Sequence, residues 1–337
     1  MSQEYKIIIP MAGLGSRMRP HTWSKPKPLL PLAGKTVLDH SLDQFKTLPD
    51  LDKAEFVFII SPNQGDLIQK HMSRVHPEKK VHFIVQEEMR GQSHALWCAR
   101  EYLTGPMLMV FSDTLIETDL RFLSDEDADA VAWVKPMEDP RRFGVIEMNP
   151  EGLATRLVEK PADVHNNLVL VGFYYFRQSE ALLEAINEQM RRGTSLKGEY
   201  FLADAINILI ENGARMRKQQ IDTWLDAGIP AAVLETNRYY LEQGRAGASA
   251  TGPLPGVAII PPVYIAPDVR LESCVIGPHV SIAAGCRLKN VVISNSIIDA
   301  QTSVENMVVE GSIIGCDVVL SGKIQSLNIG DNSEVMG

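Results

Sequence analysis

The chain has 337 residues, of which 45% are hydrophobic and 22% are charged, ordinary values for a folded protein large enough for two domains. Its formal net charge of −9 excludes a general binder of nucleic acid or membrane surfaces, because such proteins need an excess of Lys and Arg. Any anion site must therefore be local.

The sequence also bears on the compartment. The first residues, MSQEYKIIIP, include an acid and too short an apolar run for a signal peptide. No stretch approaches the roughly 18 apolar residues of a membrane helix. The cysteines show no CxxC spacing, which favours free thiols. We expect a cytoplasmic protein.

Apolar runs alternate with segments of helical periodicity over the first two thirds of the chain. Strands are expected at 5–11, 54–60, 81–86, 106–113, 129–134 and 167–176. Helices are expected at 37–48, 63–75, 91–103, 179–192 and 200–213. The strand segments are continuously apolar, as in a sheet covered on both faces. This order predicts a doubly wound, Rossmann-like α/β domain at 1–243.

The texture changes near residue 243. Residues 244–256 are rich in Gly, Ala and Pro and are expected to form a linker. Beyond them, short Val, Ile and Leu pulses recur about every six residues, with slips after Leu271 and Leu288. Hexapeptide spacing predicts a parallel β-helix over 257–337, with the apolar residues stacked inside.

The first predicted strand is followed by a glycine-containing basic stretch. Residues 6–38 hold six Lys and Arg side chains and no carboxylate. A dinucleotide-binding turn does not fit, because residue 18 is Met where a third glycine is needed and the prolines that follow prevent a helix. The GKT at 34–36 lacks the glycine that a P-loop requires five residues earlier.

A long irregular loop whose backbone amides face phosphates fits this stretch better. Arg17 can chelate phosphate oxygens with its guanidinium, and Lys27 can act as a point charge between two prolines. The alternative is a solvated basic loop without a ligand.

Residues 13–31, GLGSRMRPHTWSKPKPLLP, resemble the signature G-x-G-[ST]-R-x-x-P-x-T followed by P-K-P-L-x-P of the sugar-1-phosphate nucleotidylyltransferases. The glucose-1-phosphate thymidylyl- and uridylyltransferases are the most similar type, with mannose-1-phosphate guanylyltransferases nearby. Many members carry a left-handed β-helix after the catalytic domain, so the resemblance covers nearly the whole chain. It implies catalytic roles for Arg17 and Lys27. It also implies a nucleotide-binding role for Ala12, Gly13, Gly15 and Ser16.

Residues 85–96, VQEEMRGQSHAL, resemble the segment with which the family reads the base. The resemblance implies that Gln86 hydrogen-bonds the base edge and that Gly91 lets the backbone meet the nucleotide. Gln92 and Ser93 depart from the commoner residues, which leaves the base preference open. For His94 we favour a packing or capping role.

Two acidic segments complete the expected nucleotide site. The strand at 106–113 ends with Asp113, and ligands of open α/β sheets bind at the carboxyl ends of strands. The segment WLDAGIP at 224–230 resembles the family's second acidic motif. Together they imply that Asp113 and Asp226 hold Mg²⁺. The alternatives are a turn residue for Asp113 and an N-cap for Asp226, before a helix at 230–242.

Segments 141–147, 158–161 and 171–176 resemble the sugar-binding pieces of the family. The resemblance implies that Gly144 and Gly172 offer backbone groups to the hexose, that Glu159 accepts from its hydroxyls and that Lys160 holds its phosphate. GEYFLAD at 198–204 resembles a further family segment, to which we assign no chemistry.

The expected reaction is Mg²⁺-dependent transfer of a nucleoside monophosphate from a nucleoside triphosphate, dTTP or UTP favoured, to a sugar 1-phosphate, glucose 1-phosphate favoured. The expected partners are these substrates and further copies of the chain, without nucleic acid or membrane. Two alternatives stay open. One is a bifunctional enzyme whose β-helix, with His279, is an acyltransferase, and the other is a regulatory subunit that kept the fold without the chemistry.

Overall fold

The structure, a computed structural model, describes residues 4–196, 198–247 and 255–323. The chain forms two compact units. The first comprises the residues up to Leu30 together with Thr36–Ala232, and the second comprises Pro31–Lys35 and the residues from Val233 onward. Parts of the expected linker (248–254) and of the expected β-helix domain (324–337) lie outside the described residues. The sequence-based domain limits remain a proposal.

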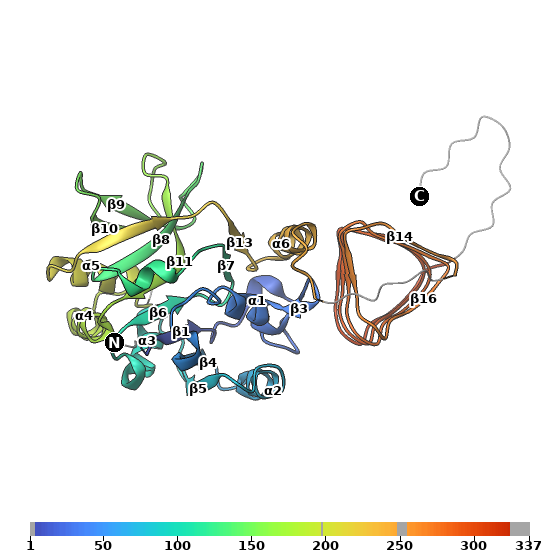
Figure 1. The fold of residues 1–337 in the computed structure, drawn as a ribbon, viewed down its shortest axis with the longest axis horizontal. Coiled ribbons are helices and arrows are strands. Elements are labelled where there is room, and N and C mark those ends of the chain that lie inside the picture. The colour runs from blue at the N-terminus through green and yellow to red at the C-terminus, as the bar shows by residue number, and fades with distance from the viewer. Residues whose placement is uncertain (1–3, 197, 248–254, 324–337) are drawn as a thin grey trace. The chain divides into compact units, whose positions relative to one another are not determined.

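The first unit is built on a mixed sheet of nine strands (Figure 1). In order across the sheet the main path is β10-β9-β11-β6-β1-β4-β5, with β8 beside β11 and β12 beside β8. The strands are β1 (Lys6–Pro10), β4 (Glu55–Ile60), β5 (Lys80–Val85), β6 (Met107–Val110), β8 (Ala130–Pro136), β9 (Gly144–Met148), β10 (Ala154–Glu159), β11 (Leu168–Phe176) and β12 (Met216–Gln220). Strands β6, β1, β4 and β5 are parallel, whereas β11 runs antiparallel to β6, β8 and β9.

Helices cover both faces of this sheet. They are α1 (Val37–Asp43), α2 (Gly65–Val75), α3 (Gln92–Cys98), α4 (Ser179–Arg192) and α5 (Leu202–Glu211). Ile8 of β1 points into a buried cluster shared with α3, α4 and α5. Its neighbours Ile7 and Ile9 point into a second cluster shared with α1 and α2. The two-sided burial explains the continuously apolar strands and confirms the doubly wound α/β prediction.

Several predicted limits need correction. The helices expected at 37–48 and 91–103 end at Asp43 and Cys98, the latter followed by a 3₁₀ turn. The strand expected at 106–113 ends at Val110, so Asp113 lies in a turn before β7 (Thr114–Ile116). Strand β7 pairs with β13 (Trp224–Asp226).

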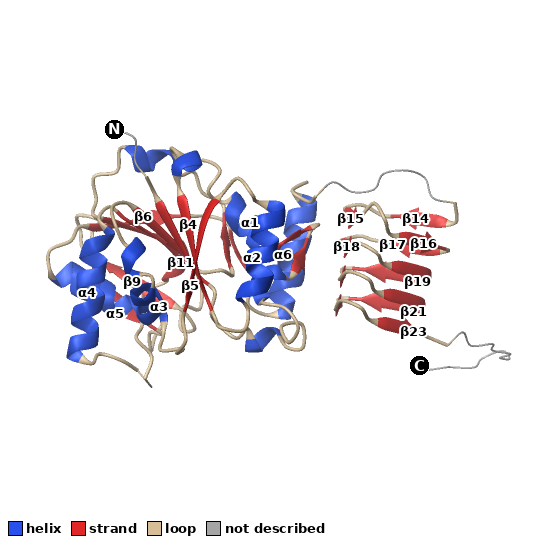
Figure 2. Cartoon of the chain, turned by 90° about the horizontal axis from the view of Figure 1, so that it is seen from below, coloured by secondary structure: helices blue, strands red, loops and turns tan. Residues whose placement is uncertain are grey.

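The second unit contains a parallel β-helix with a triangular section (Figure 1) and strands stacked coil upon coil (Figure 2). Its strands are β14 (Val257–Ile259), β15 (Val263–Ile265), β16 (Arg270–Glu272), β17 (Cys274–Ile276), β18 (Val280–Ile282), β19 (Arg287–Ser294), β20 (Ile297–Ile298), β21 (Ser303–Glu310), β22 (Ile313–Ile314) and β23 (Val319–Ser321). The buried residues Ile265, Ile282, Ile298 and Ile314 lie in one column.

The column explains the imperfect hexapeptide period. Its residues are 17, 16 and 16 positions apart (282 − 265, 298 − 282 and 314 − 298), whereas three full hexapeptides need 18. One or two sides of each coil are therefore one residue short. The slips predicted from the sequence fall at these shortened sides.

Helix α6 (Pro230–Glu242) continues into the second unit and meets the β-helix there. The buried Asn237 side chain accepts hydrogen bonds from the Ala33 N–H (3.0 Å) and the Ser281 hydroxyl (2.7 Å). Nearby, the Nε2 atom of His279 lies 3.0 Å from the Glu242 carboxylate. His279, the residue considered for acyl transfer, thus contacts α6. Among the described helices, none has the length and apolar character needed to span a membrane.

Candidate active site

A cavity of about 480 Å³ opens at the carboxyl ends of strands β1, β5 and β6. In open α/β sheets this is the edge at which ligands bind. The predicted site residues that line it are Ala12, Gly13, Gly15, Ser16, Arg17, Lys27, Gln86, Gly91 and Asp113. Sequence segments as far apart as Pro10 and Gly228 therefore converge on one hollow within the first unit.

The basic stretch after β1 is an irregular loop, as predicted. It contains two 3₁₀ turns, Ser16–Met18 and Lys27–Leu29, of which Met18 and Pro28 are buried. The Thr22 hydroxyl donates to the Gly15 carbonyl (2.8 Å), which holds the two ends of the first bend together. The buried side chains and this bond hold the backbone of the loop, from which Arg17 and Lys27 project.

Lys27 and Asp113 form the central charge pair of the cavity. The Lys27 ammonium group donates to the Asp113 carboxylate, and the Lys27 side chain is only 11% exposed. Arg17 lines the same cavity and is exposed. A cation buried to this degree is costly unless it is paired, and the Asp113 carboxylate supplies the pairing.

Asp226 lies beside Asp113. In the β7–β13 pair it stands opposite Thr114, and the Ala227 N–H donates to the Asp113 carbonyl (3.1 Å). Burial, with the negative charge of Asp113, raises the pKa of Asp226. Its Oδ1 accepts from the Gly228 N–H (2.7 Å), and Asp226 itself ends β13 four residues before α6 begins, so it is not the N-cap residue of that helix. Gly228 lines the cavity, where a Cβ would lie 2.7 Å from Asp226 Oδ1.

Gln86 follows β5 and is held by a residue that the sequence analysis treated as a packing residue. Its Nε2 lies 3.1 Å from His94 Nδ1 and 3.3 Å from the Gly91 carbonyl. Burial, together with the Arg90 charge, lowers the pKa of His94, which favours the neutral ring that can accept this hydrogen bond. His94 therefore orients the amide expected to read the base.

The segment 198–204, to which no chemistry was assigned, forms the wall behind Gly91. Gly91 has a φ of +96°, and a Cβ there would lie 2.6 Å from the backbone N and O of Tyr200. The Ser93 N–H donates to the Tyr200 carbonyl (3.1 Å), and Glu199 lines the cavity. Glu199 is not among the residues predicted from the sequence, although its segment resembles a family motif.

The residues expected to bind the sugar lie outside the cavity lining. Gly144 and Glu159 face each other across the β9–β10 pair, and Lys160 follows with its ammonium group 5.8 Å from the centre of the Phe201 ring. Burial, with a contribution from Asp204, raises the pKa of Glu159. The Gly172 carbonyl accepts from the N–H of Phe111, a cavity residue that the sequence analysis also missed.

Comparison with known proteins decides the family. The model of the family described as nucleotidyl transferase matches residues 6–243, well over half of the chain. The chain belongs to the nucleotidyl transferase family. Its glycine-containing loop, acidic pair and cavity all lie within the matched residues.

The relatives of this chain differ in how much of their length they share with it. It is 33% identical to the bifunctional protein GlmU of Methanocaldococcus jannaschii over 70% of its own chain but only 54% of that protein. The chain thus spans about half the length of the GlmU proteins it matches. A glucose-1-phosphate thymidylyltransferase of Streptomyces antibioticus is 27% identical over 98% of this chain and 99% of its own.

A solved structure of a UDP-glucose pyrophosphorylase complexed with UDP-glucose shares the fold of this chain. The TM-score is 0.59 with 20% identity, over 72% of this chain and all of the other. At this identity the likeness concerns the fold alone.

Proposed function

We propose that this chain transfers a nucleoside monophosphate from a nucleoside triphosphate to a sugar 1-phosphate and releases pyrophosphate. One observation carries the proposal. Arg17 and Lys27 line the same cavity as Asp113, with Asp226 beside it, so cations suited to a triphosphate and carboxylates suited to a metal share one site.

The proposed reaction is an in-line displacement at the α-phosphorus. A phosphate monoester is already an anionic nucleophile, so no residue has to remove a proton from it. Catalysis then rests on positioning and on neutralising negative charge. In this proposal Arg17 stabilises the leaving pyrophosphate, Lys27 holds the triphosphate and Lys160 holds the incoming phosphate.

The acidic pair fits a divalent cation. Burial and the charge of Asp113 raise the pKa of Asp226, a cost that a cation bound between the two carboxylates would relieve. Carboxylate oxygens are ligands that Mg²⁺ prefers. We propose that Asp113 and Asp226 hold Mg²⁺, which when bound would offset charge on the phosphates. On binding of a triphosphate, Lys27 exchanges its partner Asp113 for phosphate oxygens.

The favoured substrates are dTTP or UTP with glucose 1-phosphate, as the sequence resemblance implies. The thymidylyltransferase from Streptomyces antibioticus, similar over nearly the whole chain, supports the choice of glucose 1-phosphate. Gln86 and Gly91 are proposed to bind the base, and Gly144, Glu159 and Gly172 the hexose. A cytoplasmic location and a homo-oligomeric state also remain proposals.

Pyrophosphate release across a grid of substrates tests this function. Purified protein with Mg²⁺ is given dTTP, UTP, GTP, CTP or ATP, each with glucose, mannose, galactose or N-acetylglucosamine 1-phosphate. We expect one preferred pair of substrates and loss of that signal in Asp113→Ala. A blank grid from folded protein would contradict the proposal and favour the regulatory-subunit alternative.

A further inference from the structure

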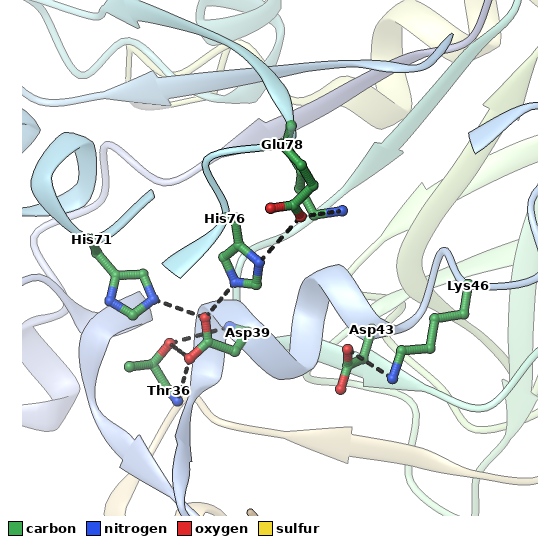
Figure 3. Close-up of polar contacts among 8 residues, drawn as sticks. Thr36, Asp39, Asp43, Lys46, His71, His76 and Glu78 are labelled. Carbon is green, nitrogen blue, oxygen red and sulfur yellow. Dashed lines mark hydrogen bonds and ion pairs between the residues drawn. The ribbon is translucent and has the colours of Figure 1, made fainter. Parts of the chain in front are cut away.

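Three side chains of metal-ligand type converge in the first unit, outside the lining of the cavity (Figure 3). Asp39 lies in the first turn of α1, His71 near the end of α2, and His76 directly after α2. The Nε2 atoms of His71 and His76 each lie 2.8 Å from the same oxygen, Asp39 Oδ1. Within the described residues, no other group of three His, Cys, Asp or Glu side chains converges in this way.

The helix cap uses one carboxylate oxygen of Asp39, and the two imidazoles contact the other, Oδ1. Asp39 closes a capping box with Thr36, whose backbone N–H (2.8 Å) and hydroxyl (2.7 Å) both donate to Oδ2. Oδ1 therefore faces away from the helix cap. The Asp39 and His71 side chains are about one-tenth exposed and that of His76 is 18% exposed.

The surroundings of the three side chains resemble those of a metal centre. Ligands of bound metals are usually oriented by a second set of hydrogen bonds or charges. Here Thr36 fixes the carboxylate, and the Glu78 carboxylate lies 3.9 Å from His76 Nδ1, the ring nitrogen that faces away from Asp39. Two imidazole nitrogens and one carboxylate oxygen form a ligand set typical of Zn²⁺ sites.

We propose that Asp39, His71 and His76 bind a divalent transition-metal ion, with Zn²⁺ the best match to the ligand set. Bonds of about 2.0–2.1 Å place neighbouring tetrahedral ligands about 3.4 Å apart, so each nitrogen must move only about 0.5 Å from Oδ1. Water supplies the fourth ligand on the side of His76, the most exposed of the three.

The ion would link α1 to the end of α2, two segments that β4 separates in the sequence. Asp39 belongs to the helix that follows the basic loop, whereas His71 lies in the last turns of α2 and His76 directly after it. An ion bound only by the folded arrangement stabilises that arrangement by mass action. The ion is therefore expected to stabilise the fold, independently of the proposed catalytic pair Asp113 and Asp226.

The test is metal binding by the full chain, stripped of metal with a chelator. Addition of Co²⁺ alone should give the intense visible absorption of a tetrahedral ion, and Zn²⁺ should displace it at one ion per chain. Zn²⁺ should also raise the Tm. Absence of the Co²⁺ band from the wild-type protein overturns the proposal and leaves a hydrogen-bonded cluster.

Matched variants test which side chains bind the ion. His76→Gln, at the most exposed ligand, should abolish the Co²⁺ band and the Tm rise, and Asp39→Asn should do the same while it keeps an acceptor for the cap. His82→Gln is the control, because His82 Nε2 also lies 2.8 Å from a carboxylate, that of Glu55, without a second imidazole on the same oxygen. A band that survives both ligand variants contradicts the assignment. Such a band assigns the ion to other side chains.

Discussion

The ammonium group of Lys27 has two possible partners, a carboxylate and a phosphate. In the structure it neutralises Asp113, and in the proposed complex it neutralises phosphate. Lys27→Met should therefore lower kcat by roughly two to three orders of magnitude, as loss of one preorganised charge typically does. Steady-state pyrophosphate release measures this effect.

The control for this variant comes from the same loop. Arg19→Met also removes one positive charge, but Arg19 is exposed and does not line the cavity. It should keep kcat within a few-fold of the wild type. Equal losses in the two variants would show that net positive charge matters, and would contradict a specific role for Lys27.

Lys6 shows where the charge pattern of the sequence misleads. It belongs to the basic stretch at 6–38, yet its ammonium group pairs with Glu55 (2.8 Å), which also contacts Lys80 (2.5 Å) and His82 (2.8 Å). Burial alone would raise the pKa of Glu55, but hydrogen bonds from Lys6 and Lys80 lower it to about 2. The cluster is absent from the cavity lining.

The lowered pKa of Glu55 predicts a pH-dependent contribution to stability. A carboxylate whose folded pKa lies below its unfolded value stabilises the fold above the unfolded pKa, and that contribution is lost as the pH falls toward the folded value. Unfolding by urea should show Glu55→Gln less stable than the wild type near neutral pH. The difference should shrink from about pH 4.5 toward pH 2. A stability difference between the two proteins that does not change with pH would contradict a lowered pKa of Glu55.

At the scale of elements, the sequence predicted the helices and strands that have a regular spacing of apolar residues. The helices at 179–192 and 230–242 match α4 and α6, because their apolar spacing and flanking residues agree with their tertiary burial. Strands β9, β10 and β12 were not expected as strands. In β10 and β12 only some side chains are buried, so no continuous apolar run marks them.

The candidate site shows the same difference between residues in recognisable patterns and contacts that depend on packing. Motif residues that follow parallel strands could be assigned to one edge of the sheet, and the cavity collects nine of them: Ala12, Gly13, Gly15, Ser16, Arg17, Lys27, Gln86, Gly91 and Asp113. The contact between His94 and Gln86 could not be foreseen, because it depends on the rotation of α3. The Asp39–His71–His76 cluster depends on how α1 and α2 pack, which spacing along the chain does not encode.

The junction between Gly91 and the segment 198–204 predicts an element-scale effect. In Gly91→Ala a Cβ would meet the Tyr200 backbone at 2.6 Å and would also adopt an unfavourable positive φ. We expect the start of α3 to shift, with a loss of stability of about 1–3 kcal/mol and a raised KM for the nucleotide. Chemical unfolding and steady-state kinetics measure the two effects.

Gly213→Ala separates the clash from the backbone strain. Gly213 has a similar φ of +93° at the end of α5, but a Cβ there would meet nothing within 4 Å. It should cost about 1 kcal/mol, the ordinary penalty for a side chain at such a position, and leave the KM unchanged. Identical effects of the two substitutions would exclude the contact with Tyr200 as the cause.

At the scale of the whole molecule, the cavity and the β-helix belong to different units. Every residue that lines the cavity belongs to the first unit. The second unit is organised by the columns of the β-helix and by the buried Asn237 of α6. A substitution that weakens the second unit should therefore change stability without changing the chemistry in the cavity.

Asn237→Ala tests this division. It removes the acceptor for the Ala33 N–H and the Ser281 hydroxyl, both buried, and a buried donor left without a partner costs about 1–3 kcal/mol. Hydrogen exchange should accelerate in β15 and β18, whereas kcat and KM should stay within about twofold of the wild type. Ser281→Ala removes one of the two donors, so its added cost in the Asn237→Ala background should be smaller than in the wild type. Strictly additive costs would mean that Asn237 and Ser281 do not interact, and a large fall in kcat would contradict the separation of the two units.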